Sequence, residues 1–363
     1  MIKAASFQGF KRLNKNNFSF TPLTILSGMN GAGKTSLLHG LLLANESWRR
    51  ADSLVELNGP FGLSLGNFKD LLNHASDERF LIRLTDGDGR VLDWNFEGAE
   101  TDLFAKATRN RGYNRKAQVF SEEPRSFQYI CAERQGPRLS QAASALPPHM
   151  LEVGHAGEYC AQMIYTLGNS PIDELRILKN GDNNPPLLKP QTEFWLSRVT
   201  RPLQIDTENY PAANQFALKF RTEEDWVKAP NTGFGITFAL PVILAALSAA
   251  NNGTLLVENP EAHLHPSGQS QIGLFLALMA NAGLHIIVET HSDHVINGVR
   301  RAIGDFKYVK SSDVCVYHFD TKLGIDPVKL QFTSTGSMSG WPPGFFDQYQ
   351  IDIEALSRAR RAS

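Results

Sequence analysis

The sequence contains few cysteines, and no two of them form a close pair. Its 363 residues include only Cys131, Cys160 and Cys315, which are widely spaced. Without a CxxC pair, neither a cysteine-based zinc site nor a disulfide framework is expected. A chain of this length can bury enough apolar surface to fold without crosslinks. A reducing compartment fits this composition, so we expect the protein to be cytoplasmic.

Long apolar segments and an excess of one charge are also lacking. The first residues carry no apolar core of a signal peptide. The longest apolar run, Phe234–Ala250, contains Pro241 and is short for a membrane span, so we expect a buried helix and no membrane partner. The 36 Lys and Arg residues nearly balance the 37 Asp and Glu residues. Binding of nucleic acid would therefore need a local basic patch.

One such patch is present in the first half of the chain. The segment Lys106–Lys116 places five basic residues around Tyr113, and they are Lys106, Arg109, Arg111, Arg115 and Lys116. This arrangement suits contacts with a phosphate backbone. The alternative is the solvated tip of a β-hairpin. Binding of DNA is therefore kept as a hypothesis.

Hydrophobic periodicity predicts an α/β fold. Strands are expected over residues 2–10, 17–20, 23–27, 79–84 and 91–96, with a helix over 36–44. The turn chemistry at 86–89 favours an antiparallel β subdomain there. Residues 138–228 are polar, rich in proline and expected to be helical, without heptads long enough for a coiled coil. After Gly253, strands over 254–257 and 285–289 alternate with helices over 269–282 and 293–303, which predicts a parallel sheet.

A glycine-rich phosphate-binding motif lies between the strand 23–27 and the helix that follows it. GMNGAGKTS, residues 28–36, fits G-x-x-x-x-G-K-[ST] in the strand-loop-helix context that the motif requires. Backbone N–H groups of such a loop surround phosphates, the lysine neutralises phosphate charge and the hydroxyl binds Mg²⁺. The predicted ATP-binding residues are Asn30, Gly31, Ala32, Gly33, Lys34, Thr35 and Ser36, with Thr35 also a metal ligand.

Two later strands end in polar clusters that fit the other side of a nucleotide site. TLLVENPEAHLHP ends its apolar strand at Glu258, the position of a carboxylate that holds Mg²⁺. IIVETHSDHVI places His291 after the next strand. Four histidines in these clusters, His263, His265, His291 and His294, raise a metal site as an alternative. The nucleotide interpretation is favoured because each cluster follows a sheet strand and no cysteine completes a metal set.

Two further segments contain glycine and charge at turns. Thr232, Gly233 and Gly235 precede an apolar helix and form a small-residue helix start that suits an anion. The alternative is a glycine-rich loop before a core helix. In CAERQGPR, Arg134 and Arg138 flank a rigid turn and are candidates for contact with a partner subunit or with nucleotide. An ion-paired turn is the alternative for them.

The order of these motifs resembles the SMC/RecF/OLD-related branch of ABC ATPases found in bacterial defence and repair. The segment GSMSGWPPGFFDQ, residues 336–348, is similar to the C-terminal part of a bacterial ATPase family of unassigned function. The resemblance implies an ABC-type ATPase head in four parts. Residues 1–137 carry the Walker A loop and the β subdomain, 138–228 form a helical insertion, 229–305 carry the signature-like loop, Walker B and the switch histidine, and 306–363 close the head.

The resemblance also implies how the site works. ATP and Mg²⁺ would be held between two subunits, with the Thr232–Gly235 loop of one subunit gripping the γ-phosphate bound by the other, and His291 would contact that phosphate. In this family a glutamate that activates water usually follows the Walker B acid, and here that residue is Asn259. An amide cannot accept a proton, so either Glu261 or a water relay replaces it, or hydrolysis is slow. Glu258, Glu261 and His291 are the predicted catalytic residues.

Two functional hypotheses follow from the resemblance. In the first, the ATP-bound homodimer controls an effector on another chain, such as a nuclease, because the part after His291 lacks the acidic set that a two-metal nuclease needs. In the second, the protein is a DNA-binding repair clamp like RecF, whose affinity for DNA depends on ATP and salt. A third reading of the same site is an ATP-sensing switch that does not hydrolyse.

Overall fold

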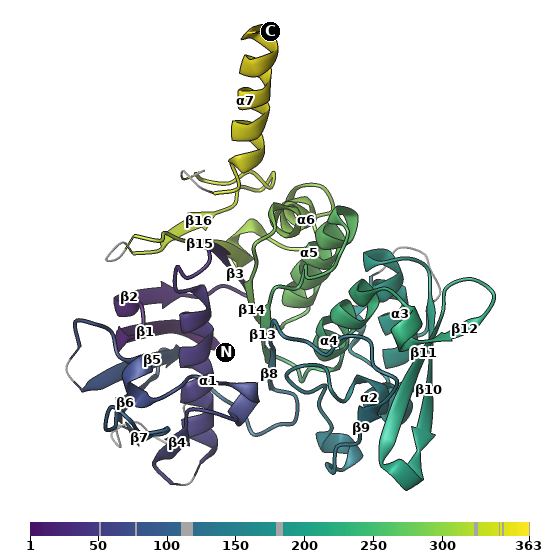
Figure 1. Cartoon of the computed structure of the whole chain (residues 1–363), viewed down its shortest axis with the longest axis horizontal. Coiled ribbons are helices and arrows are strands. Elements are labelled where there is room, and N and C mark those ends of the chain that lie inside the picture. The colour runs from purple at the N-terminus through teal and green to yellow at the C-terminus, as the bar shows by residue number, and fades with distance from the viewer. Residues whose placement is uncertain are drawn as a thin grey trace.

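The computed structural model describes residues 1–50, 52–76, 78–109, 119–178, 184–322, 326–340, 342 and 345–362. Three β-sheets and the helices around them make up the fold (Figure 1). The helices are α1 (Lys34–Arg49), α2 (Cys160–Leu167), α3 (Leu188–Val199), α4 (Phe234–Ser248), α5 (Pro266–Asn281), α6 (Asp293–Gly304) and α7 (Gln348–Ala362). The predicted α/β fold is confirmed. The longest of these helices have 16 residues, so the described chain has no long coiled coil.

The central sheet is mostly parallel and has the strand order β16-β15-β3-β14-β13-β8. Its strands are β3 (Leu23–Gly28), β8 (Phe127–Ile130), β13 (Thr254–Glu258), β14 (His285–Glu289), β15 (Val314–Phe319) and the antiparallel β16 (Val328–Gln331). Every residue of β13 and β14 is buried, as expected for a strand covered on both faces. Because β3 pairs with β14, and β14 with β13, the carboxyl ends of these three strands meet at one edge.

A six-stranded antiparallel sheet is built from residues between Ile2 and Arg109. Its order is β2-β1-β5-β6-β7-β4, with β1 (Ile2–Phe10), β2 (Leu13–Ser19), β4 (Leu54–Glu56), β5 (Arg79–Asp86), β6 (Val91–Glu97) and β7 (Phe104–Arg109). The predicted β subdomain is confirmed. Helix α1 packs between this sheet and the central one, and a Cβ at Gly40 would lie 2.3 Å from the Phe7 ring. Glycine at this position therefore lets the helix approach β1 closely. The basic segment 106–116 lies mostly outside the described residues.

Residues 138–228 contain more β structure than the sequence pattern predicts. Helices α2 and α3 lie where helices were expected, but a second antiparallel sheet joins them, formed by β9 (Gln141–Ala142), β10 (Gln204–Tyr210), β11 (Gln215–Arg221) and β12 (Trp226–Lys228). Strand β10 has mostly exposed polar side chains, so it lacks the apolar alternation that marks a strand. The segment packs on the core, because the Trp195 and Phe275 rings are 5.0 Å apart.

Alternate residues of the central strands divide the interior into two cores. Ile25, Val257 and Val288 face α4, α5 and α6, whereas Leu26 and Ile287 face α1 and the antiparallel sheet. The apolar run from residue 234 forms the buried helix α4, as predicted. No helix in the described part of the chain combines the length and the apolar character needed to span a membrane. Helix α7 stands out from the body at the C-terminal end (Figure 1).

Candidate nucleotide site

The glycine-rich loop joins β3 to α1 at the carboxyl edge of the central sheet. Gly28, Gly31 and Gly33 all have positive φ angles, of 132°, 73° and 107°. A Cβ at Gly28 would lie 2.3 Å from the Phe319 carbonyl oxygen, so the loop needs glycine there for space as well as for conformation. Asn30 and Gly31 are exposed at the tip of the loop, whereas Ala32 and Gly33 are buried and Ser36 is half-buried. The tip of the loop before α1 is therefore open to solvent.

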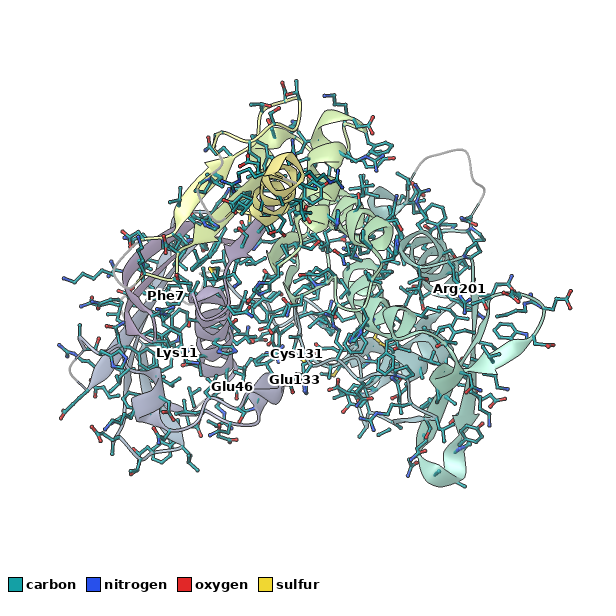
Figure 2. All side chains as sticks on the ribbon, turned by 45° about the horizontal axis from the view of Figure 1, so that its top comes forward. Phe7, Lys11, Glu46, Cys131, Glu133 and Arg201 are labelled. Atoms are coloured by element: carbon teal, nitrogen blue, oxygen red, sulfur yellow. The ribbon has the colours of Figure 1, made fainter. Side chains whose placement is uncertain are left out.

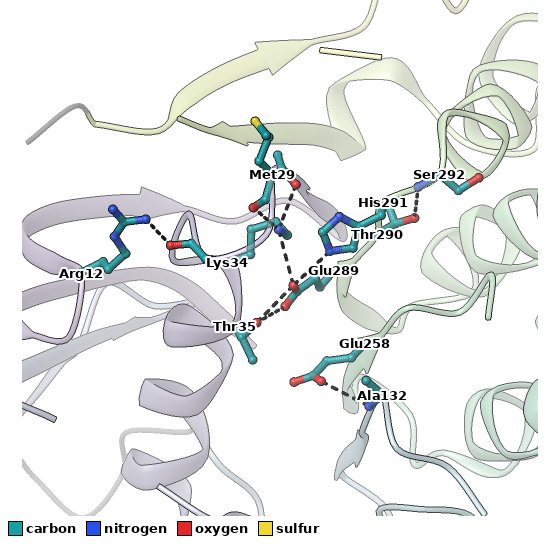
Figure 3. Close-up of polar contacts among 12 residues, drawn as sticks. Arg12, Met29, Lys34, Thr35, Ala132, Glu258, Glu289, Thr290, His291 and Ser292 are labelled. Atoms are coloured by element: carbon teal, nitrogen blue, oxygen red, sulfur yellow. Dashed lines mark hydrogen bonds and ion pairs between the residues drawn. The ribbon is translucent and has the colours of Figure 1, made fainter. Parts of the chain in front are cut away.

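Lys34 and Thr35 converge on one carboxylate, that of Glu289 (Figure 3). The Thr35 hydroxyl lies 3.1 and 2.9 Å from the two carboxylate oxygens, and the Lys34 Nζ atom is 3.7 Å from Oε1. Lys34 also donates to the carbonyl oxygens of Gly28 and Met29, at 2.9 and 2.8 Å. Burial lowers the pKa of Lys34, and the nearby Glu289 partly offsets this effect. The ammonium is thus held at the mouth of the loop.

Glu289 forms a pair with the predicted Walker B acid, Glu258. The two residues are register partners on the parallel strands β14 and β13, so their carboxylates emerge side by side at the edge of the sheet. Glu258 accepts hydrogen bonds from the Tyr129 hydroxyl at 2.8 Å and from the Ala132 N–H at 3.2 Å. Burial raises the pKa of Glu258, and the Glu289 charge raises it further. This pair concentrates negative charge beside Thr35.

The donor set beside Thr35 fits a hard divalent cation. Mg²⁺ prefers oxygen ligands, and one or two carboxylates together with a hydroxyl and phosphate oxygens are its usual partners. Burial and the neighbouring Glu289 charge both raise the pKa of Glu258, and a cation bound there would offset these effects. Thr35 and Glu258, the predicted metal ligands, therefore suit Mg²⁺. Among the described side chains, no group of three or more His, Cys, Asp and Glu residues could hold a metal ion by itself.

Asn259 and Glu261 lie in the turn that follows β13. Asn259 has a φ of 44°, a left-handed conformation that asparagine tolerates better than most residues, and its N–H donates to the Glu289 carbonyl oxygen at 2.8 Å. Glu261 accepts a hydrogen bond from the His291 N–H at 2.7 Å, while its second carboxylate oxygen is buried without a hydrogen-bond partner. The His291 Nε2 atom is 3.8 Å from Glu289 Oε1. Two of the predicted catalytic residues, Glu258 and His291, therefore lie beside Glu289, and Glu261 is bonded to the His291 main chain.

The four histidines have separate surroundings. His263 packs edge-on against the Phe238 ring, with ring centroids 4.5 Å apart, and His265 caps α5 by accepting from the Ser267 N–H at 3.4 Å. His291 faces Glu289 across the site, and His294 lies 3.7 Å from Asp293. These four histidines therefore do not converge on one point.

The signature-like loop lies beside the turn after β13. Gly233 caps the N-terminus of α4, and a Cβ at this residue would meet nothing within 4 Å. Thr232 is buried and donates its hydroxyl to the Ala229 carbonyl oxygen at 2.7 Å. A Cβ at Gly235 would lie 2.8 Å from the His263 carbonyl oxygen, so the start of α4 fits tightly there. The loop therefore offers an open glycine at a helix N-terminus.

Two residues of the site were not predicted from the sequence. Glu289 lies within the quoted ETHSDH segment, but its pairing with Glu258 depends on the strand order. Arg12, in the turn between β1 and β2, donates to the carbonyl oxygens of Gly31 and, at 3.0 Å, of Thr321. It braces the glycine loop from the antiparallel sheet. No sequence motif marks it.

Comparison with known families gives a match over residues 23–297 to the family described as "AAA domain, putative AbiEii toxin, Type IV TA system". Comparison with curated proteins gives no significant match. The chain is similar to the Smc head domain from Pyrococcus furiosus, solved with an extended coiled coil and bound to the C-terminal domain of ScpA. The TM-score is 0.54 at 11% identity, and 99% of each chain is covered.

A second similar structure is an SmcHead bound to the C-winged helix domain of ScpA. Its TM-score is 0.52 at 12% identity, with 91% of this chain and 97% of that chain covered. The structure of the recombination mediator protein RecF gives a TM-score of 0.44 at 12% identity, with 90% of this chain and 98% of that chain covered. The two Smc-head likenesses show that the chain has the α/β fold of such a head domain.

Proposed function

The chain belongs to this family of AAA domains, and from that premise we propose that it binds MgATP, closes around it as a homodimer and thereby controls an effector protein. The observation that carries the proposal is the convergence of Lys34 and Thr35 with the carboxylates of Glu258 and Glu289 at one edge of the sheet. A lysine ammonium, a hydroxyl and two carboxylates at one edge together recognise phosphate charge and a divalent metal ion.

Each residue has a distinct part in the proposed site. Lys34 exchanges its backbone oxygen partners for phosphate oxygens, and the N–H groups from Gly31 to Ser36 surround the phosphates. Thr35 and Glu258 hold Mg²⁺, which when bound neutralises phosphate charge. Glu289 keeps the Thr35 hydroxyl and the Lys34 ammonium oriented. His291, whose main-chain N–H fixes Glu261, would contact the γ-phosphate.

Glu261 is the residue that we propose as the general base for slow ATP turnover. One of its carboxylate oxygens is fixed by the His291 N–H, and the other is buried without a hydrogen-bond partner, so it would act as a base once bound nucleotide brings a water molecule to it. A non-hydrolysing ATP switch is the second candidate function. It is favoured by Asn259, whose amide takes the place next to Glu258 where a carboxylate base would be expected.

Dimerisation is proposed from the signature-like loop. Gly233 is open to solvent and caps α4, and the loop packs on the turn after β13 of its own chain. A helix N-terminus of this kind can bind the γ-phosphate held by a second copy. ATP would then lie between two subunits and stabilise the pair by mass action.

The effector role rests on the family and on the similar structures. The description of the matched family, "AAA domain, putative AbiEii toxin, Type IV TA system", names a toxin. The two Smc heads were solved with a bound domain of ScpA. We propose by analogy that this head also acts through a partner chain, such as a nuclease, in a cytoplasmic bacterial defence or DNA-processing system. Direct binding of DNA by the dimer is the alternative outcome.

Substitution of Lys34 tests the proposal. Lys34→Ala should weaken binding of MgATP at least about 100-fold, because the phosphates lose their main cationic partner. It should also abolish ATP-dependent dimerisation. The measurements are calorimetric titration with ATP and Mg²⁺ and sedimentation velocity with and without nucleotide. Lys69→Ala is the matched control, because Lys69 forms an exposed ion pair with Glu100 away from the loop.

The same experiment separates the parts of the proposal. Nucleotide binding by Lys34→Ala with wild-type affinity would refute the site. Wild-type protein that binds MgATP and stays monomeric would refute the dimer and keep the site. Retention of duplex DNA by the ATP-bound wild type, weakened by salt, would favour the DNA-binding alternative over a protein effector.

A further inference from the structure

A buried arginine lies between the two halves of the nucleotide head. The segment after β8, which contains Cys131 and Glu133, runs through the middle of the molecule in Figure 2, between the N-terminal lobe with Phe7 and the lobe that carries Arg201. Arg134 follows directly and is only 4% exposed. Burial lowers the pKa of its guanidinium to about 10, so it remains charged at neutral pH. A buried charge of this kind needs partners.

The hydrogen bonds of Arg134 go to backbone oxygens of two different elements. Its two terminal nitrogens donate to the Phe238 carbonyl in α4 at 3.2 Å, to the Glu258 carbonyl at 3.0 Å, and to the Asn259 carbonyl. The guanidinium also lies over the Phe238 ring, 5.5 Å from its centroid. Arg134 thus joins the second turn of α4 to the end of β13. Only the planar, forked guanidinium can reach all three oxygens.

Aromatic contacts strengthen the same junction. His263, in the turn after β13, packs against Phe238 and lies 5.3 Å from the ring of Phe234, the first residue of α4. A Cβ at Gly136, two residues after Arg134, would lie 3.0 Å from the Phe234 ring. The signature-like loop therefore cannot move relative to the end of β13 without disturbing this cluster.

We propose that Arg134 is a positioning residue that transmits the occupancy of the Glu258 site to the signature-like loop of the same subunit. This inference rests on the proposed function, because MgATP is the ligand that reaches Glu258. Glu258 would hold Mg²⁺ when MgATP is bound; a shift of the end of β13 on binding would then reach Phe238 through Arg134 and change how the start of α4 faces a second subunit. A nucleotide in one site thereby prepares the loop that grips the nucleotide of the other subunit.

Hydrogen–deuterium exchange on the full-length protein tests this coupling. The readout is the peptide covering residues 229–240, with and without MgATP, at protein concentrations low enough to keep the chain monomeric. In the wild type, MgATP should change its exchange rate at least about fivefold. Arg134→Lys keeps the charge but cannot span the three oxygens. It should lose this response while binding MgATP within about threefold of the wild type.

Arg176 provides a matched control at the other end of the same helix. It is 2% exposed and donates to the carbonyl oxygens of Leu247, Ala249 and Ala250 at 3.0, 2.5 and 3.2 Å. Arg176→Lys should cost similar stability but keep the exchange response. If Arg134→Lys does not fold, Gly235→Ala serves as the second variant. Its added methyl group would push α4 away from His263, so this variant should also lose the exchange response.

Each outcome decides the inference. It is overturned if the wild type binds MgATP without a change in the 229–240 peptide, or if Arg134→Lys responds like the wild type. It is also overturned if both arginine variants lose the response equally, because the role of Arg134 would then be general support of α4. Absence of MgATP binding by the wild type, which titration detects separately, refutes the proposed function and the inference with it.

Discussion

Glu261 and Asn259 lie two residues apart in one turn but face different surroundings. Asn259 turns the chain with a left-handed backbone, and its side-chain oxygen is buried without a hydrogen-bond partner. Glu261 is fixed by the His291 N–H and keeps one free oxygen. Under the proposed function, Asn259 can follow Glu258 because Glu261, two residues after Asn259, supplies the carboxylate for proton transfer.

The substitution Glu261→Gln tests this division of roles. The glutamine can still accept the His291 hydrogen bond but cannot take a proton, so kcat for ATP should fall at least about 100-fold. The dissociation constant for MgATP should change little. Steady-state turnover and titration measure the two quantities, with Asn259→Ala as the control, which should keep turnover within about threefold of the wild type. Equal turnover by Glu261→Gln and the wild type would show that Glu261 is not the base.

Sequence patterns identified most single residues of the site but not how they pair. The glycine loop, Glu258 and His291 are recognisable because their motifs have fixed spacing along the chain. The importance of Glu289 depends on β14 lying between β3 and β13, which is a property of the strand order. Arg12 and Arg134 act through hydrogen bonds to backbone carbonyls, which leave no pattern in the sequence. For Arg134, the ion-paired turn that was one alternative gives way to bonds with backbone oxygens.

At the scale of elements, the strands and helices with regular apolar spacing were predictable. Strands β1 and β14 begin and end at the predicted residues. The sheet of β9 to β12 was missed because long-range pairing, rather than local alternation, determines it. The limits of the four predicted parts, at residues 137, 228 and 305, remain predictions. The Gly336–Gln348 segment likewise keeps only a predicted family relation.

Helix α7 and the segment before it differ sharply in how they pack. The apolar side chains of α7 are exposed, with Tyr349 at 76% and Leu356 at 58%. Phe345, just before the helix, is 1% exposed and packs edge-on against His318, with ring centroids 5.2 Å apart. Together with Gly28, Met29 and His291, these two residues line a cavity of about 310 Å³ beside the glycine loop.

This contrast predicts different effects of two changes on stability. Ending the chain after Asp347 should leave the melting temperature within about 1 °C of the full-length value, because α7 buries almost no apolar side chain. Phe345→Ala should lower the free energy of unfolding by about 3 kcal/mol, because it leaves a cavity in the core. Thermal and urea unfolding measure both. A large loss of stability on removal of α7 would mean that the helix packs against the body in solution.

At the scale of the whole molecule, two buried cores meet at the central sheet, and His285 lies at the start of β14 within it. His285 is 0% exposed, and burial lowers its pKa to about 3. The unfolded chain binds a proton at this residue below about pH 6.5, whereas the folded chain does not until the pH is far lower. Stability is therefore lost as the pH falls below 6.5.

The substitution His285→Leu should reduce this acid sensitivity. Between pH 6 and pH 5 the wild type should lose about 1.4 kcal/mol more stability per pH unit than the variant, because one fewer proton is taken up on unfolding. Urea unfolding at a series of pH values measures the difference. Parallel curves for the two proteins would show that His285 is protonated in the folded state near its ordinary pKa. His39, whose pKa burial also lowers to about 3, contributes equally in both.

The position of β3 in the central sheet has a consequence for how the protein is made. Residues 23–28 carry the strand that leads into the glycine loop, but its two neighbours, β14 and β15, come from residues 285–289 and 314–319. A ribosome releases the amino-terminal part first. The growing chain must therefore keep this apolar strand unpaired until β14 and β15 have been made, and Lys34 meets Glu289 only after residue 289 has left the ribosome. A chain that stops before residue 285 leaves this apolar strand without either neighbour, so we expect it to be bound by chaperones.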